Sequence, residues 1–590
     1  MALLSFSRAA GILSKLGLRP YLLKARSYLS NPHKTWTYDS AIRRDYRTWR
    51  REARPWLQQS NFKANRQKKV LIVSLSPVIY RIKLETLFAR ALYERGYEPF
   101  FLVYKHTPIP NHPSAYFHAA RFGQTLYFED YQPSQDAIKE KVREETKRLL
   151  AEKPSPQEFA NLTYRGVYLG EHLLSSLSRT LHLGRIDLQR PDASAFVRRV
   201  LPEVLGNVHA AESLMDQVNP DLVLFNDTSY THYGPIHDIA INRGCNAVQF
   251  TYIAEDDALI WKRCTAETRR THPNSLSPQS WKSAKSMLWT SEMDTALDQH
   301  FRDRYGERWY MSRRNQHKKI VKAKKQVQQD LGLNSDKKTV VLFSHILWDA
   351  NLFYGEDLFE DFGEWFLETV RIAYENSSVN WVIKLHPGNI WKRISEGWND
   401  TSDEVRLIES KLGPLPSHVR LLPPETELNT FSMFAVTDYA ITVRGTIGIE
   451  LSCFGVPVFT AGTGRYSDLG FTIDSKTKEE YLKRLQNIQE YPPLTPKQKE
   501  LARRHAYTLF ILRPWRFQSV RSVFKPVEQG NHPLAWDLEL KDPKQSELST
   551  APDFKALVDW LEDSARIDYL ERPPDNGESH QPSMVKELRW

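Results

Sequence analysis

The 590-residue sequence has only three cysteines, Cys245, Cys264 and Cys453, and no two of them form a CxxC pair. So sparse a set argues against a disulfide framework or a zinc site, and it suits a reducing cytoplasm. No run of 18 apolar residues occurs, so no membrane span is expected. The turn after the first expected strand begins at Ser74 and has no GxGxxG fingerprint, so the sequence does not support a dinucleotide site there.

Acidic residues are scarce at the start of the chain. Residues 1–70 contain 16 Lys and Arg against 3 Asp and Glu, whereas the remaining residues contain 65 against 68. The formal net charge of +10 therefore belongs to the N-terminal arm. Residues 1–30 interleave Leu, Ile, Phe and Tyr with five basic residues and have no acid. This pattern predicts an amphipathic basic helix that can lie on an anionic membrane surface.

Two other interpretations of this arm stay open. It can be a helix that covers the body of the protein itself, or, in a eukaryote, an acid-free targeting presequence. Arg and Trp alternate over 43–56, as they do in some nucleic-acid-binding segments. No nucleic-acid module follows this segment, so no nucleic-acid partner is expected.

The rest of the sequence alternates short apolar strands with helices, which predicts an α/β fold with two doubly wound, Rossmann-like domains. In the first, a strand–helix–strand unit spans 68–105, and a later strand ends at Asn226-Asp227. In the second, the buried strand KTVVLFS over 338–344 is followed by the strands WVIKL and YAITV. Highly charged sequence that reads as mainly helical separates the two domains.

These patterns divide the chain into six parts. We predict a basic amphipathic arm over 1–67, an N-terminal Rossmann-like domain over 68–260, a helical connector over 261–335, a C-terminal Rossmann-like domain over 336–490, a helical return over 491–565 and a disordered tail over 566–590. The two domains are expected to face each other across a cleft.

Two strand ends in the second domain carry the residues most suggestive of chemistry. The strand WVIKL supplies Lys384 and ends at His386-Pro387, and YAITV ends at Arg444-Gly445-Thr446, which opens an apolar helix. Backbone N–H groups at a helix start, together with the helix dipole, favour a phosphate there. Ligands of open α/β sheets lie at the carboxyl ends of the strands. The sequence therefore predicts a site for a phosphorylated ligand.

The same segments carry a family resemblance. KLHP and RGTIGIELSCFGVPV, followed by GRYSDLGFTID, resemble bacterial capsule and surface-polysaccharide glycosyltransferases of the GT-B fold over 338–485. The HP pair is similar to that of the branch that uses CMP- or CDP-activated donors, which includes sialyl- and Kdo-transferases and the CDP-glycerol polymerases. A strand ending in HP and a following strand ending in RGTxGxE form a more specific signal than HP alone.

The resemblance implies a metal-independent glycosyltransferase with no cofactor apart from its nucleotide-activated sugar donor. The C-terminal domain would bind that donor, and the N-terminal domain would bind a glycan or lipid-linked glycan acceptor. Such an enzyme would be cytoplasmic or peripheral on the inner face of the cytoplasmic membrane. The anionic membrane surface would be contacted through residues 1–67.

Eight residues are predicted to bind the donor. Phosphate contacts are expected at the helix start, a ribose contact is implied for a glutamate on that helix, and an arginine in a glycine-rich loop can cover the donor. The eight are Ser344, Lys384, His386, Arg444, Gly445, Thr446, Glu450 and Arg465.

Four residues are predicted to be catalytic: Asp227, Glu255, His345 and His386. Asp227 and Glu255 follow strands of the first domain, and a carboxylate there, with Asp256 as the neighbour of Glu255, can accept a proton from an acceptor hydroxyl. The imidazoles of His345 and His386 can donate to the departing phosphate. His345 lies close in sequence to Asp349 and Asn351, but this is too small a set for a metal site.

Other functions remain open at this point. A CDP-polyol phosphotransferase of teichoic-acid type would use the same site, with attack at phosphorus. A nucleotide-sugar epimerase would share the two α/β domains but need no acceptor groove. A scaffold that has lost its activity would release no nucleotide.

Overall fold

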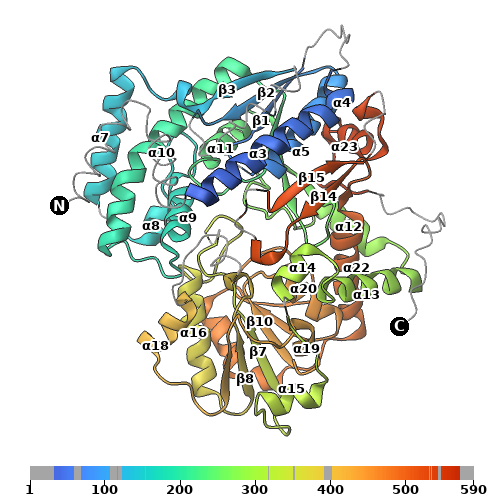
Figure 1. Ribbon diagram of the computed structural model, residues 1–590. Coiled ribbons are helices and arrows are strands. Elements are labelled where there is room, and N and C mark those ends of the chain that lie inside the picture. Colours follow the sequence, from blue (N-terminus) through green and yellow to red (C-terminus); the bar gives the residue numbers. More distant parts are fainter. Residues whose placement is uncertain are drawn as a thin grey trace.

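The computed structural model describes residues 32–58, 68–76, 78–105, 116, 122–152, 154–316, 318–349, 352–390, 402–529, 532, 534–541 and 547–571. These residues form two large sheets covered by helices, one in each half of the molecule, and a small two-stranded sheet near the C-terminus of the described chain (Figure 1). The structure confirms the predicted α/β fold with two doubly wound domains, the arrangement of GT-B proteins.

A seven-stranded sheet forms the centre of the N-terminal half. Its order is β13-β6-β5-β4-β1-β2-β3, parallel from β5 to β3 and antiparallel where β6 pairs with β5 and β13. Its strands are β1 (Lys68–Val73), β2 (Tyr97–Val103), β3 (Gln124–Tyr127), β4 (Leu222–Phe225), β5 (Asn246–Tyr252), β6 (Ala258–Cys264) and β13 (Trp515–Arg516). Apolar runs such as VLIV in β1 are buried because helices cover both faces of a parallel sheet.

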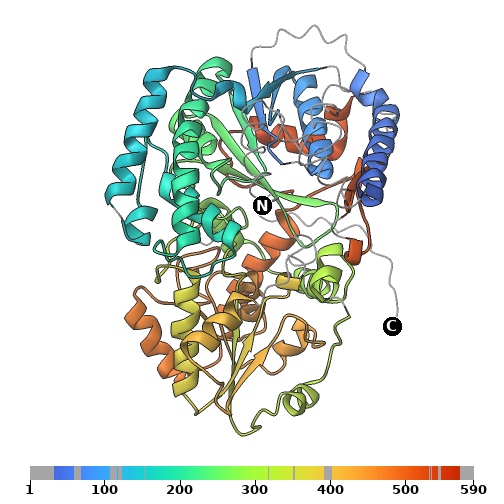
Figure 2. The same ribbon diagram turned by 60° about the vertical axis from the view of Figure 1, so that its left-hand side comes forward.

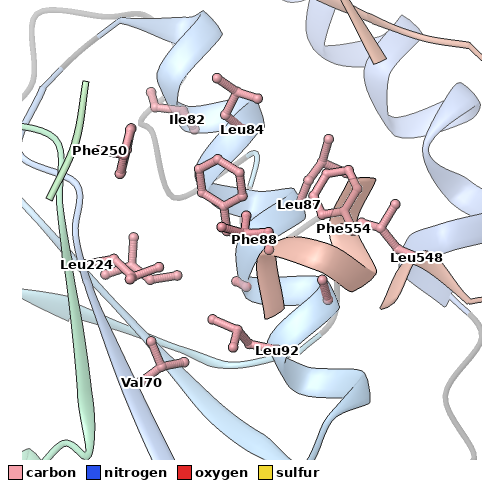
Figure 3. Packing of buried hydrophobic residues seen from close by; sticks show 14 of the residues in the cluster. Val70, Ile82, Leu84, Leu87, Phe88, Leu92, Leu224, Phe250, Leu548 and Phe554 are labelled. Carbon is pink, nitrogen blue, oxygen red and sulfur yellow. The ribbon is translucent and has the colours of Figure 1, made fainter. Parts of the chain in front are cut away.

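Helices cover both faces of this sheet (Figure 2). They are α5 (Ile79–Glu94), α7 (Asp136–Glu152), α8 (Pro156–Ala160), α9 (Leu169–Leu181), α10 (Pro191–Val218) and α11 (Gly234–Asn242), with the short helix η1 (Phe128–Tyr131). Figure 3 shows Phe88 of α5 between the sheet residues Leu224 and Phe250 and the side chain of Phe554. Burying a phenylalanine of this kind contributes about 1.5–3 kcal/mol, so α5 is fixed from both sides.

A six-stranded, fully parallel sheet forms the centre of the C-terminal half. Its order is β12-β11-β10-β7-β8-β9. The strands are β7 (Thr339–Phe343), β8 (Asn380–Lys384), β9 (Val419–Leu422), β10 (Tyr439–Thr442), β11 (Val458–Thr460) and β12 (Ile473–Asp474). The helices are α16 (Phe362–Glu375), α18 (Asp403–Lys411), α19 (Thr430–Phe434), α20 (Thr446–Cys453) and α21 (Lys478–Gln486), with η2 (Ile488–Glu490). Because β10, β7 and β8 are neighbours, their carboxyl ends meet at one place.

The connector between the halves is shorter than predicted. Its helices are α12 (Pro278–Ser286), α13 (Ser291–Tyr305), α14 (Tyr310–Gln316) and α15 (Lys324–Asp330). The sequence prediction placed residues from 261 onward in helices, but β6 continues to Cys264. Its charged residues misled the prediction, because Lys262 is buried in an ion pair with Asp568, 2.9 Å between Nζ and Oδ1.

The C-terminal return is helical only in part. Its elements are α22 (Pro496–Tyr507), the π-helical turn η3 (Thr508–Leu512), β13, β14 (Val520–Phe524), η4 (Val527–Gln529), β15 (Trp536–Leu540), η5 (Leu548–Thr550) and α23 (Pro552–Glu562). It adds an edge strand to the N-terminal sheet, and α23 packs on α5. The predicted tail begins too early, since Asp568 and Tyr569 are buried, and 572–590 lie outside the described residues.

The described part of the N-terminal arm packs on the body of the protein. Helix α3 (Pro32–Glu52) and helix α4 (Arg54–Gln58) bury Ile42, Trp49 and Trp56 against the N-terminal half. The arm segments 1–31 and 59–67 lie outside the described residues. Of the helices that the structure describes, none has the length and apolar character needed to cross a membrane.

Candidate functional site

A pocket of about 220 Å³ lies where β7, β8 and β10 end. The connector helices α13 and α14 form the opposite wall, and Ala254 lines the pocket from the N-terminal half. Most of the predicted site residues of the C-terminal half line this pocket. They are Ser344, His345, Lys384, His386, Gly445, Thr446, Glu450 and Arg465.

Lys384 places a buried amine in the pocket. Its side chain is 3% exposed, and within the described residues its Nζ makes no hydrogen bond or ion pair. Burial, with a smaller contribution from Lys319, lowers the pKa of the amine to about 7. A buried ammonium without a counter-ion is unfavourable, so the pocket is arranged to receive an anion from outside.

The start of helix α20 faces the same space. Gly445 is the N-cap residue in an extended conformation, and the amides of Thr446 and Ile447 have no hydrogen-bond partner among the described residues. These are the N–H groups that a helix leaves unsatisfied at its first turn. Together with the helix dipole they form an anion site next to Lys384.

Gly448 does not line the pocket and serves packing. A Cβ there would lie 2.1 Å from the Oη of Tyr466. Tyr466 donates to the carbonyl of Gly445 at 2.6 Å and so holds the start of α20 from behind. The glycine is therefore needed for the tyrosine that supports the turn.

His345 organises the turn after β10. Its Nε2 lies 3.2 Å from the amide of Arg444 and 3.2 Å from Oγ1 of Thr442. Burial, and then the nearby charges of His386, Arg465 and Arg444, hold the pKa of His345 well below its usual range. The imidazole is therefore neutral, and it accepts the amide proton through Nε2 and carries its own proton on Nδ1.

His386 lies across the pocket at the end of β8. Its backbone amide donates to Oγ of Ser344 at 3.1 Å. Its Nδ1 accepts from the amide of Gly388 at 3.0 Å, so Nε2 carries the ring proton. Ser344 thus fixes the main chain of the predicted histidine donor.

Glu450 is held by two residues that the sequence analysis did not single out. Arg304 of α13 places Nη2 3.2 Å from Oε1 of Glu450 and donates to Oγ1 of Thr446 at 3.1 Å. The hydroxyl of Tyr305 donates to the other carboxylate oxygen. Arg304 lies in a charged connector helix, where its sequence context gives no sign of a role in a pocket.

The two predicted arginines differ in position. Arg444 does not line the pocket; its guanidinium pairs with Asp357 and lies 5.5 Å from the ring centre of Phe362. In this structure the Arg444 side chain is therefore directed to Asp357 and not into the pocket. Arg465 does line the pocket, its Nη2 is 3.0 Å from Nε2 of His272, and burial lowers its pKa to about 10.

The two predicted carboxylate bases do not line the pocket. Asp227 accepts from the amide and hydroxyl of Ser229 at 3.1 and 3.0 Å, as a turn aspartate does. Glu255 forms a bidentate pair with Arg516, at 2.7 and 3.0 Å. Neither lies where it could accept a proton in this pocket, because acids that follow strands are used here for turns and ion pairs.

Two further carboxylates near the strand ends have raised pKa values. Glu85 of α5 is buried, accepts from Ser74 and Asn226, and has its pKa raised to about 7 by burial. Asp256 accepts from the amide of Tyr310 at the start of α14, and burial raises its pKa to about 6. Asp256 therefore ties the N-terminal half to the helix that forms one wall of the pocket.

Helix α14 contributes polar groups that the sequence analysis missed. The Oγ of Ser312 and the Oδ1 of Asn315 are buried, line the pocket and lack a hydrogen-bond partner in the part of the chain that the structure describes. Gln316 exchanges hydrogen bonds with Thr430, at 3.1 and 3.0 Å. Two of the seven residues of α14, Arg313 and Arg314, are charged, and the helix lies in a charged stretch, so no pattern marked these positions.

No cluster of metal ligands is present in the ranges that the structure describes, taking groups of three or more His, Cys, Asp or Glu. Asp349 accepts from the hydroxyl of Tyr230 at 3.1 Å and lies 3.7 Å from Arg179. Asn351, the third member of the set noted in the sequence, lies outside the described residues.

No family model matches the chain, and no curated protein matches it. Among solved structures, the β-Kdo 2,4-transferase KpsC of Thermosulfurimonas dismutans shares 14% identity at a TM-score of 0.29, covering 53% of this chain and 87% of its own. HepE of Anabaena, in complex with UDP and glucose, shares 13% at 0.25, covering 80% and 98%. The UDP-GlcNAc 2-epimerase of Neisseria meningitidis shares 11% at 0.23, covering 75% and 98%. TM-scores this low carry no weight of their own, and the fold assignment rests on the strand order.

Proposed function

We propose that the protein is a glycosyltransferase of the GT-B type that transfers a sugar from a nucleotide-activated donor to a growing surface or capsular polysaccharide. The observation that supports this most is the pocket in which the uncompensated amine of Lys384 lies beside the start of α20. A buried amine and free helix-start amides together suit the phosphate of a nucleotide.

The donor phosphate would lie between Lys384 and the amides of Thr446 and Ile447. His386, with its proton on Nε2, would donate to the oxygen that leaves with the nucleotide. The positive groups of the chain would neutralise the charge that develops on this oxygen. Divalent metal would not be required for that role, which agrees with the metal independence implied by the family resemblance.

The rest of the donor would extend along α13 and α14. This wall offers the buried polar atoms of Ser312 and Asn315, and Glu450 of α20 lies in the same pocket; these groups suit the hydroxyl and amide-like groups of a nucleoside. The HP pair at His386 favours a CMP- or CDP-linked donor. The acceptor, a glycan or lipid-linked glycan, would approach from the N-terminal half, and its hydroxyl would attack the donor carbon.

A donor screen tests the binding part of this proposal. CMP-, CDP-, UDP- and GDP-linked sugars would be compared for thermal stabilisation of the wild type, of Lys384→Met and of Lys324→Met. Lys324 is an exposed lysine of α15 and serves as the matched control. A ligand that binds the native state raises its stability, so one nucleotide class should stabilise the wild type and the control but not Lys384→Met.

Turnover then separates the functions that share this architecture. A glycosyltransferase releases nucleotide from its donor in the presence of a glycan acceptor. Release of an epimerised nucleotide sugar without acceptor would point to an epimerase, and transfer of a polyol phosphate to a phosphotransferase. No nucleotide binding by the wild type in any of the four classes would contradict the proposal.

A further inference from the structure

Helix α3 is fixed to the N-terminal half along one side. Ile42 and Trp49 are buried against the body of the protein. Lys83 of α5, itself 2% exposed, places its Nζ 2.6 Å from Asp45 of α3 and 2.5 Å from Asp537 of β15. The apolar side of this amphipathic helix is therefore already occupied, and the helix has a fixed orientation on the protein.

The opposite side of α3 is an arginine face, which we define as Arg43, Arg44, Arg47 and Arg50. All four are exposed, and none has a hydrogen bond or ion pair among the described residues. Positions 43, 47 and 50 follow the spacing i, i+4, i+7 and form a stripe about 10 Å long. Figures 1 and 2 show α3 on the outside of the N-terminal half.

Acidic residues do not compensate this face. Of the three acids in α3, Asp45 is bound to Lys83, Asp39 is buried and Glu52 is paired with Arg51. The exposed arginine Arg148 of α7 differs, since it contacts both Glu145 and Glu152. The positive charge of the arginine face is therefore available to attract an anionic partner outside the chain.

The sequence next to α3 indicates which partner this is. The sequence of residues 1–31, which precede α3, contains no acid and has five basic residues among Leu, Ile, Phe and Tyr. Basic charge together with apolar side chains is the combination that binds an anionic bilayer, whereas a soluble polyanion needs only the charge. We propose that the arginine face of α3 is a contact through which the protein adheres to an anionic membrane surface.

The position of α3 has a consequence for the proposed enzyme. This consequence, unlike the membrane contact itself, rests on the proposed function. Helix α3 lies on the half that would bind the acceptor, so adhesion through α3 would bring that half close to the lipid. The glycan of a membrane-anchored acceptor would then have only a short distance to span between the membrane and the protein. The attraction should fall with salt over a Debye length of about 10 Å at 0.1 M.

The test uses the full-length chain and a fourfold variant, with Arg43, Arg44, Arg47 and Arg50 each replaced by Gln. A matched control replaces four exposed lysines of the C-terminal half, Lys324, Lys325, Lys497 and Lys499, by Gln. Both variants remove four positive charges. Sedimentation would be measured with phosphatidylcholine vesicles and with vesicles of phosphatidylcholine and phosphatidylglycerol in equal amounts.

The wild type and the lysine control should bind the anionic vesicles and not the neutral ones, and binding should weaken as salt rises. The arginine variant should bind them at least about a hundredfold more weakly, since each basic residue near an anionic surface contributes about 1 kcal/mol. A second variant with the four arginines replaced by Lys should keep the binding, because the attraction depends on charge. Thermal unfolding of each variant establishes that it is folded.

Several results would overturn the proposal. One is failure of the wild type to bind anionic vesicles at low salt. Another is binding by the arginine variant that equals binding by the wild type. Loss of binding in the Lys variant as well would indicate a shaped protein contact. If the wild type ignores vesicles but binds soluble polyglutamate through these arginines, the partner is a polyanionic chain and not a membrane.

Discussion

At the scale of single residues, the proposed anion site depends mainly on Lys384. Its amine is buried beside the start of α20 without a counter-ion, and its pKa is lowered to about 7, mainly by burial. An arrangement of this kind lowers the stability of the empty protein in exchange for anion binding. His386 and Ser344 complete the cradle through hydrogen bonds whose geometry the strand order dictates.

The first prediction concerns stability and pH. Because the folded-state pKa of Lys384 lies below its unfolded value, folding releases its proton between about pH 7 and 10.5, and the penalty is greatest below about pH 7. Lys384→Met should therefore be more stable than the wild type by about 4–5 kcal/mol near pH 6.5, and the advantage should shrink as pH rises. Urea unfolding at several pH values measures this, and a destabilised variant at low pH would contradict it.

The second prediction concerns Glu255. Since both its carboxylate oxygens are bound to Arg516, we expect Glu255→Gln to cost about 1 kcal/mol of folding free energy and to leave turnover nearly unchanged. Steady-state kinetics with a soluble acceptor and thermal unfolding provide the two readouts. A drop in kcat of about a hundredfold or more with intact nucleotide binding would restore Glu255 as the catalytic base.

At the scale of elements, the sequence predicts the parts of the site that are built from consecutive residues. The strands before His386 and Arg444 and the helix from Thr446 follow from buried apolar runs that end at Pro or Gly, and the structure has them as β8, β10 and α20. The wall formed by α14 could not be predicted, because it depends on a contact with Asp256 from another part of the chain.

The positions of the C-terminal elements could not be predicted from the sequence either. The edge strand β13 and the helix α23 belong to the N-terminal half. Their local sequence does not indicate the elements against which they pack. Lys262 and Arg263 interrupt the apolar pattern of β6, and their partners lie about 300 residues later, in Asp568 for Lys262 and in backbone carbonyls such as that of Trp560 for Arg263. The side-chain orientation of Arg444 likewise follows from Asp357, which lies on a loop after another strand.

A third prediction tests this long-range pairing. Asp568→Asn should destabilise the protein by about 3–5 kcal/mol, because the cations of Lys262 and Arg513 would remain buried without a full counter-charge. Asp563→Asn is the matched control, since its pair with Arg566 is largely exposed and should contribute less than about 1 kcal/mol. Equal unfolding midpoints for the two variants would show that the buried pairing does not hold β6.

At the scale of the whole molecule, the two halves lie on either side of the pocket and are joined by hydrogen bonds around it. On one side, Asp361 at the start of α16 accepts from the amide of Ile186 at 2.9 Å, and the amide of Gly363 donates to Gly184 at 3.0 Å. Near the pocket, Gln249 of β5 donates to the hydroxyl of Tyr354 at 3.2 Å. The chain also returns through α22 to complete the first half, so the halves are joined more than once.

The fourth prediction concerns this joint. A Cβ at Gly184 would lie 2.5 Å from the Cβ of Leu347 in the other half, so Gly184→Ala should separate the halves locally and cost about 1–3 kcal/mol. Gly206, inside the helix α10, is the control, where the nearest atom to a new Cβ is a glutamine side-chain oxygen at 3.2 Å. Gly206→Ala should be neutral or stabilising by up to about 1 kcal/mol. Urea unfolding of both variants decides, and a neutral Gly184→Ala would contradict the close joint.

The central claim is that Lys384 and the start of α20 bind the phosphate of a nucleotide, and calorimetric titration tests it most directly. The nucleotide identified by the donor screen would be titrated into the wild type and Lys384→Met at about pH 8, in two buffers of different ionisation enthalpy. A bound phosphate raises the pKa of the amine, so wild-type binding should take up close to one proton. Loss of both the affinity and the proton uptake in Lys384→Met would support the account. Equal affinity in the two proteins, with no proton uptake by the wild type, would contradict it.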